Sequence, residues 1–253
     1  MIIKQKKRQS IRKTITFISF ILYPITMFYF SPWLIIEAAS KGYISASFVI
    51  FIILFFSSLF IGRAWCGWLC PGTGMQNSLI ALKVVTKPIK IGAWIKFLIW
   101  APWLIFILFV FYMSGGIKSI DFFFNIKNGI SIDQSWKYII YYSGITVILG
   151  LNFIFGKRAF CKYSCWVSPF MIIGRKIRNL FKYPSLGIKA DISKCKNCKV
   201  CNETCPMSVD VNYLIHKISM VEHYECTLCG SCIDNCPNNV LSFSFEKYNN
   251  NKN

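Results

Sequence analysis

Four long apolar runs alternate with shorter polar segments along this chain. The runs are Thr14–Ile36, Tyr43–Gly62, Phe97–Gly115 and Tyr138–Phe155. None of them contains a charged residue, and each is close to the roughly 20 residues that an α-helix needs to cross a hydrocarbon core of about 30 Å. Four such runs in a chain of 253 residues predict an integral membrane protein with four membrane-spanning helices.

The second and the fourth apolar runs are followed by the same polar motif. RAWCGWLC begins at Arg63 and RAFCKYSC begins at Arg158, with the arginine, the alanine, an aromatic residue and two cysteines in the same register. Each motif follows two predicted membrane helices, so the sequence predicts a duplicated helical hairpin. Both motifs then emerge on the same side of the membrane, where four thiols can converge. These membrane-edge cysteines are Cys66, Cys70, Cys161 and Cys165.

The spacing of the membrane-edge cysteines leaves their chemistry open. On a helix, cysteines four residues apart lie on one face. Four converging thiolates can bind an additional iron–sulfur cluster or a soft metal such as Cu(I), or can cycle between dithiol and disulfide. The alternative is simple packing, because a free cysteine behaves as a small apolar residue. Two matched pairs in a duplicated context favour a functional site.

The other eight cysteines form two runs of identical spacing near the end of the chain. CKNCKVCNETCP begins at Cys195 and CTLCGSCIDNCP begins at Cys226. Three cysteines on one tight loop can bind three irons of a cubane, and the fourth, followed by proline, reaches the other cluster. The spacing therefore predicts two [4Fe–4S] clusters. The first is expected on Cys195, Cys198, Cys201 and Cys236, and the second on Cys226, Cys229, Cys232 and Cys205. Tetrahedral zinc is the alternative, but zinc sites usually pair two Cys-x2-Cys knuckles.

The segment Asp191–Phe245 resembles a bacterial two-cluster ferredoxin over its whole length. We therefore expect two domains. Residues 1–182 are expected to form an all-α membrane domain, a four-helix bundle made from the duplicated hairpin, which carries both Cys-x3-Cys motifs. Residues 183–253 are expected to form a small α+β ferredoxin-like domain that binds the two [4Fe–4S] clusters.

The formal net charge of +19 indicates membrane topology rather than a nucleic-acid ligand. Lysine and arginine concentrate in residues 1–13, in the 63–96 loop and from Lys157 onward, whereas the other two loops hold only four lysines. This bias is the positive-inside pattern. It predicts a multi-pass protein of the cell inner membrane, with the N-terminus and the ferredoxin-like tail in the cytoplasm against an anionic leaflet. Thiols there stay reduced, which disfavours a disulfide framework.

Nearly the whole chain resembles the NapH-type membrane quinol dehydrogenases and their MauN, NosR and CcoG relatives. The shared features are four membrane helices, CGWLCP after the second, another Cys-x3-Cys after the fourth, and a two-cluster ferredoxin tail. The chain departs from this family at Trp166, which follows the second cysteine pair where family members typically carry proline. The resemblance implies electron transfer between the membrane quinone pool and an unidentified redox partner protein, through the cytoplasmic clusters.

Missing motifs exclude several other cofactors. Neither His216 nor His223 lies in an apolar run, which excludes bis-histidine haem b, and the chain has no Cys-x2-Cys-His motif for haem c. It also has no glycine-rich dinucleotide motif and no Walker A motif. The sequence therefore favours an electron-transfer subunit whose terminal substrate chemistry occurs on another polypeptide.

A quinol site is expected at the membrane–water interface near the clusters. Arg63 or Arg158 would polarise the head group, and aromatic residues of the two motifs would wall the pocket: Trp65, Trp68, Phe160, Tyr163 and Trp166. The alternative is an interfacial aromatic belt with snorkelling arginines. Two other functions stay open at this point. One is an assembly factor resembling CcoG that reduces and hands on copper through the membrane-edge cysteines, and the other is a redox sensor or anchor.

Overall fold

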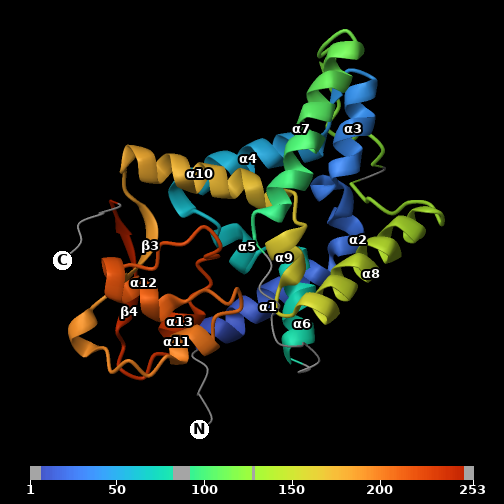
Figure 1. Ribbon diagram of the computed structural model, residues 1–253. Helices are drawn as coiled ribbons and strands as arrows, with labels where there is room; N and C mark the ends of the chain where they lie inside the picture. The colour runs from blue at the N-terminus through green and yellow to red at the C-terminus, as the bar shows by residue number, and fades with distance from the viewer. Residues whose placement is uncertain (1–6, 82–91, 127–128, 248–253) are drawn as a thin grey trace.

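Helices make up most of the chain in the computed structural model, which describes residues 7–81, 92–126 and 129–247 (Figure 1). The helical segments before the cysteine-rich tail are α1 (Lys7–Ile21), α2 (Tyr23–Thr26), the 3-10 helix η1 (Met27–Phe30), α3 (Pro32–Ser40), α4 (Ala46–Ile61), α5 (Ala64–Trp68), α6 (Pro71–Ala81), α7 (Ile95–Met113), α8 (Lys137–Phe155), α9 (Ala159–Tyr163) and α10 (Val167–Phe181). A short parallel pair, β1 (Tyr43–Ile44) with β2 (Ser119–Ile120), joins the α3–α4 connection to the segment after α7.

Several of the lysines behind the positive-inside prediction lie outside the described residues. They are Lys4, Lys6, Lys83, Lys87, Lys90, Lys127 and Lys252. The orientation of the chain in a membrane therefore stays a prediction.

The first apolar run is broken rather than continuous. α1 and the α2–η1 segment meet at a bend of 60°, and α3 then starts as a new helix. Ser31 caps α3 by accepting a hydrogen bond from the Leu34 N–H at 3.3 Å, and Pro32 occupies its first turn, where the N–H that proline lacks is not needed. The run Thr14–Ile36 is therefore divided between α1, α2–η1 and α3, because these local signals restart the helix.

Two described helices, α7 and α8, are long and apolar enough to cross a membrane, and α1 with α2–η1 could make a third, bent span. The bounds of α7 and α8 lie within two residues of the predicted runs. α4, in contrast, has 16 residues, which is about 24 Å at a rise of 1.5 Å per residue. It ends at Gly62, whose φ of 54° stops a right-handed helix. A bundle of four full-length membrane helices is therefore not confirmed.

The outward faces of α7 and α8 consist of large apolar side chains. Leu108 and Tyr112 of α7 are 62% and 81% exposed, and Ile139 of α8 is 72% exposed. An apolar surface of this extent is costly in water and marks a contact with lipid or with another protein. These two helices thus have the surface expected of membrane spans.

The backbone around the two cysteine pairs is repeated. In each copy an apolar helix (α4 or α8) ends at a glycine of positive φ, a five-residue helix (α5 or α9) follows, and a longer helix (α6 or α10) comes next. In the first copy the Cys70 N–H donates to the Trp65 carbonyl, and in the second the Cys165 N–H donates to the Phe160 carbonyl. In each pair the first cysteine therefore lies within the short helix and the second lies just after it. The spacing alone had predicted that both would lie on one face of a longer helix.

Two glycines allow helices to pack with their backbones close together. α10 runs alongside α4 (Figure 1), and a Cβ at Gly174 of α10 would clash with the Ser58 side chain of α4. A Cβ at Gly74 of α6 would clash with the Thr16 carbonyl of α1. Small residues at such crossings replace side-chain packing by direct backbone contact. These contacts hold α10 against α4 and α6 against α1.

The tail combines short helices with a two-stranded sheet. Its elements are β3 (Ser185–Ala190), η2 (Ile192–Lys194), α11 (Val200–Glu203), α12 (Val211–Ile218), α13 (Ser231–Asp234) and β4 (Leu241–Glu246). β3 and β4 are antiparallel, in a register that pairs Ser185 with Glu246 and Ala190 with Leu241. The sheet and α12 bury a core that includes Ile188, Val211 and Ile215. The cysteines pack against this core from the loops.

We expect Gly174→Leu to destabilise the protein by about 1–3 kcal/mol, the usual cost of overpacking a close contact. Gly150→Leu in α8 is the matched control, because a Cβ there meets no atom within 4 Å. The measurement is the thermal unfolding midpoint of both variants in detergent. Equal midpoints for the two variants would show that α4 and α10 do not need this close approach.

Candidate metal centres

The four cysteines predicted to hold the first cluster line one cavity. Cys195, Cys198 and Cys201 come from the loop between η2 and α11, and Cys236 follows α13. The cavity is completed by apolar side chains such as Leu241. Cys198 is exposed, so this first cavity lies at the surface of the tail.

The second cavity has the complementary set of cysteines. The cysteines that line it are Cys205, Cys226, Cys229 and Cys232. Cys229 and Cys232 are buried. Each cavity therefore takes three cysteines from one run and the fourth from the other, which is the crossed pattern that the spacing predicted.

The two cysteine loops repeat each other residue by residue. Asn197 and Leu228, at equivalent positions, have φ angles of 54° and 49°, so both loops curl through the left-handed region at the same place. The residue four positions after each crossing cysteine donates its backbone N–H to that cysteine. The two bonds are Val209 N–H to Cys205 Sγ and Val240 N–H to Cys236 Sγ, both at 3.4 Å. Such N–H···S bonds favour a thiolate and tune the potential of a bound cluster.

The spacing of the side chains fits clusters better than single ions. Within the described ranges, no three His, Cys, Asp or Glu side chains lie close enough together to hold one metal ion. Tetrahedral zinc needs four ligands at about 2.0–2.3 Å from one centre, whereas the ligands of a cubane surround a group of irons. Burial raises the pKa of Cys226 to about 12, so a bound metal must displace the thiol proton. The two cavities thus fit the predicted [4Fe–4S] clusters, and the zinc alternative is disfavoured.

The membrane-edge cysteines come together through reciprocal contacts between the two copies. Cys66 of the first copy places its Sγ 3.3 Å from the Met171 Sδ of α10, which belongs to the second copy. Gln76 of α6, in the first copy, donates from Nε2 to the Cys161 Sγ of the second copy at 3.1 Å. Both Cys66 and Cys161 are buried. The two copies therefore contact each other beside these cysteines, and the convergence of all four thiols in one site stays a prediction.

The membrane-edge thiols lack the electrostatics of a reactive redox pair. Burial raises the pKa of Cys70 well above its ordinary value, and the charges of Cys66, Cys161 and Cys165 raise it further. Burial likewise raises the pKa of Cys165 to about 12. Catalytic and redox cysteines usually have a lowered pKa. Burial therefore opposes the ionisation of Cys70 and Cys165 that dithiol–disulfide cycling requires.

α5 packs directly against the loop of the second cavity. A Cβ at Gly67 would clash with the Thr227 carbonyl and would lie 3.5 Å from the Cys229 Cα. The neighbouring Trp68 donates its indole N–H to the Leu228 carbonyl at 3.1 Å. Only a glycine at this position allows so close an approach. The first membrane-edge motif and the second cavity are therefore in backbone contact.

α1 also contacts the second-cavity loop. Gln9 donates from Nε2 to the Cys229 carbonyl at 2.9 Å and to the Asp234 carboxylate at 2.7 Å, and Arg8 forms an ion pair with Asp234 at 2.7 Å. Arg12 donates to the Gly67 carbonyl at 3.1 Å. α1 thus fastens the second-cavity loop to α5, a role that no motif in the sequence indicated.

A buried group of three charges joins α5, α7 and the tail. Arg63 donates from Nη1 to the Glu225 carboxylate at 2.8 Å and to the Tyr224 carbonyl at 3.0 Å, and Lys96 pairs with the other oxygen of Glu225. Burial raises the pKa of Glu225, but the positive charges of Arg63 and Lys96 outweigh it and hold that pKa below its ordinary value. The sequence analysis missed Glu225, although its position directly before Cys226 placed it beside a predicted ligand.

The two motif arginines are inside the protein and not at a lipid interface. Arg63 is 2% exposed and Arg158 is fully buried, so the alternative of snorkelling arginines is wrong. The predicted aromatic wall is also part of the interior. Trp166 donates its indole N–H to the Phe30 carbonyl at 3.0 Å, and Trp65 packs on the Phe30 ring with the centroids 5.1 Å apart. Phe160 and Tyr163 are buried. A quinol site at these side chains stays a prediction.

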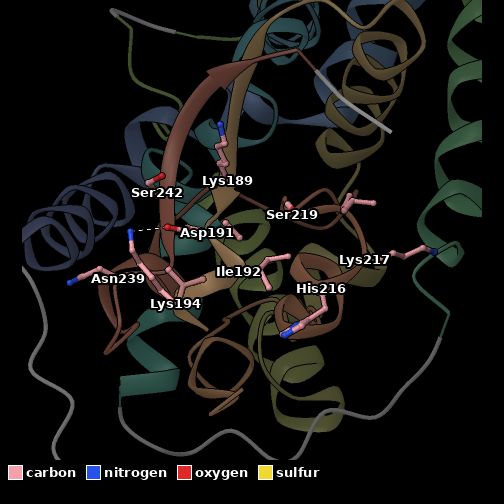
Figure 2. Close-up of a pocket in the computed structure, with 12 residues that line it drawn as sticks. Lys189, Asp191, Ile192, Lys194, His216, Lys217, Ser219, Asn239 and Ser242 are labelled. Atoms are coloured by element: carbon pink, nitrogen blue, oxygen red, sulfur yellow. Dashed lines mark ion pairs between the residues drawn. The ribbon is translucent and has the colours of Figure 1, made fainter. Parts of the chain in front are cut away.

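A basic groove lies on the surface of the tail beside the first cavity. Figure 2 shows it between β3–η2, the end of α12 and the start of β4, with Lys189, Lys194, Lys217 and His216 among its walls. Lys194 forms an exposed ion pair with Asp191 at 2.8 Å. Val240 lines both the groove and the first cavity, so the two are adjacent. Lys189 likewise forms an exposed ion pair, with Glu246.

Comparisons with known proteins agree with this division of the cysteines. A family model described as a 4Fe-4S binding domain matches residues 45–84 and 140–184, the two copies of the membrane-edge motif. A second model, described as a 4Fe-4S dicluster domain, matches residues 194–241. Family models for iron–sulfur binding thus match both the tail and the segments around the membrane-edge cysteines. No solved structure gives a significant match to the chain.

Related chains come from archaea and bacteria. An uncharacterized protein of Methanocaldococcus jannaschii is 25% identical over 94% of this chain and 94% of its own. The putative electron transport protein YccM of Escherichia coli is 23% identical over 80% of this chain and 57% of its own, and the ferredoxin-type protein NapH of Haemophilus influenzae is 23% identical over 76% and 66%. The resemblance to NapH-type proteins is confirmed, and this chain spans little more than half of YccM.

We expect Glu225→Gln to lower the thermal unfolding midpoint strongly, because removing one partner of a buried ion pair costs about 3–5 kcal/mol. Glu203→Gln is the control, since Glu203 is exposed on α11. The lowered pKa of Glu225 means that its stabilisation is complete above the ordinary value of 4.5 and is lost as the pH falls through the folded-state value. Unfolding midpoints measured from pH 7 to pH 3 should therefore converge for the wild type and Glu225→Gln. Parallel curves would contradict this assignment.

Proposed function

We propose that this protein is a membrane-bound iron–sulfur protein that passes electrons between the quinone pool and a redox partner protein. The observation that carries the proposal is the contact of α5 with the loop of the second cavity, which puts the membrane-edge motif and the tail cysteines in series. A chain that needed the tail only as an anchor or a sensor would not require this backbone contact.

In this proposal residues 183–253 are the cluster-binding domain and residues 1–182 are the membrane domain. The first cluster is held by Cys195, Cys198, Cys201 and Cys236, and the second by Cys226, Cys229, Cys232 and Cys205. A [4Fe–4S] centre carries one electron at a time, which suits transfer between a two-electron quinol and a partner. The proposed order of the clusters follows burial, since Cys229 and Cys232 of the second cavity are buried and Cys198 of the first is exposed.

We further propose that the membrane-edge cysteines hold a third iron–sulfur centre. The support is the reciprocal contact of Cys66 with Met171 and of Gln76 with Cys161, together with the iron–sulfur family model that covers both copies. The same converging thiols are what an assembly factor for copper would need. This second candidate function is therefore kept and is separated by experiment below.

The membrane assignment rests on α7 and α8, whose exposed apolar surfaces suit hydrocarbon. The lysine and arginine distribution supports a multi-pass protein of the inner membrane with its N-terminus and tail in the cytoplasm. The quinone is expected to bind where α5 and α9 approach the membrane, next to Trp65 and Trp166, which pack around the membrane-edge cysteines. The partner is expected to be acidic and to dock on the basic groove beside the first cavity.

The crossed ligand sets make a specific prediction. Cys205 lies in the first cysteine run, but Cys205→Ala should remove the EPR signal of the second cluster. Cys229→Ala should remove the same signal. Cys198→Ala should remove the other signal. The measurement is EPR of anaerobically purified, reduced protein with iron counted per chain. If Cys205→Ala and Cys198→Ala abolish the same signal, the crossing is wrong.

The function itself is tested by electron exchange with quinone. Purified protein in detergent should exchange electrons with a quinol or quinone analogue, seen as bleaching or recovery of cluster absorbance. The wild type should hold about twelve irons per chain if the third site is a cubane. Replacement of Cys66, Cys70, Cys161 and Cys165 by serine should leave about eight irons and block quinone exchange, while dithionite still reduces the tail clusters.

Other results select the alternatives. A quadruple serine variant that loses Cu(II) reduction but keeps quinone exchange would support the copper assembly factor. Wild-type protein with both tail clusters but without any quinone exchange would refute the electron carrier and leave a sensor or anchor.

A further inference from the structure

Arg63 and Arg158 occupy equivalent positions in the two copies of the motif, and both are buried. Their exposed fractions are 2% and 0%. Arginine stays protonated in proteins, so the interior contains two fixed positive charges. A charge removed from water is tolerated when a counter-charge and hydrogen bonds replace the lost hydration. The two copies differ in how they meet this requirement.

Arg63 has its counter-charge within the protein. Its Nη1 lies 2.8 Å from a carboxylate oxygen of Glu225, which is itself 2% exposed at the side chain. The same Nη1 also donates to the Tyr224 carbonyl. The first copy therefore neutralises its arginine with a residue of the tail.

Arg158 has no such carboxylate. Its Nη2 donates to the Asn77 side-chain oxygen at 2.8 Å, a neutral acceptor. Its Nε and Nη1 are buried without a hydrogen-bond partner, and no carboxylate of the described residues lies within ion-pair distance of it. Leaving a buried charge uncompensated is costly, and the described residues supply no counter-charge beside this guanidinium.

Arg158 lies between the membrane-edge cysteines and the second cavity. It directly precedes α9, and Cys161 of α9 belongs to the same buried cluster as Leu228 and Cys232 of the second-cavity loop. Burial raises the pKa of Cys66 and of Cys205, and the charge of Arg158 opposes that rise at both thiols. The unpaired guanidinium is thus within electrostatic range of a thiol from each site.

We propose that Arg158 is the built-in counterion of the iron–sulfur cluster in the second cavity. This inference rests on the proposed function, because it requires the cluster that Cys205 and its three partners are proposed to bind. A cluster ligated by four thiolates has a net negative charge, and one-electron reduction adds another negative charge. A fixed cation therefore stabilises the reduced form and raises the reduction potential. Arg158 takes no part in a chemical step, because its role is to place a fixed positive charge beside the cluster.

The test is the midpoint potential of each tail cluster in the full-length, anaerobically purified protein, from an EPR-monitored titration with dithionite. Arg158→Gln should shift one midpoint to a more negative potential, and that midpoint should belong to the signal that Cys205→Ala removes. Arg158→Lys keeps the charge and should stay near the wild type. Lys157→Gln loses the same charge at the adjacent, partly exposed position and should have little effect on either midpoint.

Three outcomes would overturn the proposal. The first is an unchanged pair of midpoints in Arg158→Gln with full iron content. The second is a shift confined to a signal that disappears in Cys66→Ser, which would assign the arginine to the membrane-edge site. The third applies if Arg158→Gln lowers the iron content. Arg158→Lys must then have the wild-type iron content and midpoint potential. If it does not, Arg158 acts through the shape of its side chain and not through its charge. Wild-type protein with both clusters but no quinone exchange would refute the proposed function without affecting this test.

Discussion

The backbone contact between α5 and the second-cavity loop is the constraint on which the arrangement of this protein depends. Gly67 has no side chain to separate the two segments, and Trp68 closes the contact with a hydrogen bond to Leu228. The buried charges of Arg63 and Glu225 lie on one side of it, and Arg12 of α1 lies on the other. A small displacement of α5 would thus break polar contacts that have no water to replace them, which fixes the tail rigidly beneath the membrane-edge motif.

The duplicated motif makes such a contact in only one of its two copies. Both copies place an arginine, a short helix and two cysteines in the same order, and the copies contact each other beside Cys66 and Cys161. Only the first copy touches the second-cavity loop through a glycine, since Lys162 stands in α9 where Gly67 stands in α5. The copies have therefore specialised: one contacts the tail through its backbone, and the other contributes Cys161 and Arg158 to the apolar interior next to it.

Local signals were predictable from the sequence, and long-range pairing was not. The cysteine spacing predicted which four side chains would line each cavity, because tight loops with a fixed offset have few geometries; the ligand assignment itself stays a prediction. The cap at Ser31 and Pro32 is local, but the sequence analysis took the whole apolar run as one segment and did not place a helix start there. The burial of Arg63 depends on Glu225, which lies 162 positions away, and no pattern of spacing or hydropathy connects two such residues.

The position of α1 has a consequence for how the protein is made. Gln9 contacts the Cys229 carbonyl across 220 positions of the chain, so one of the first helices to be synthesised completes its contacts with one of the last loops. At roughly 5–20 residues per second, the polar face of α1 waits about 10–45 seconds for its partner. During that interval the polar face of α1 contacts water or another protein. The second-cavity loop leaves the ribosome before α1 has contacted it. Docking of α1 thus closes the assembly, after the cysteines of that loop have become accessible for metal loading.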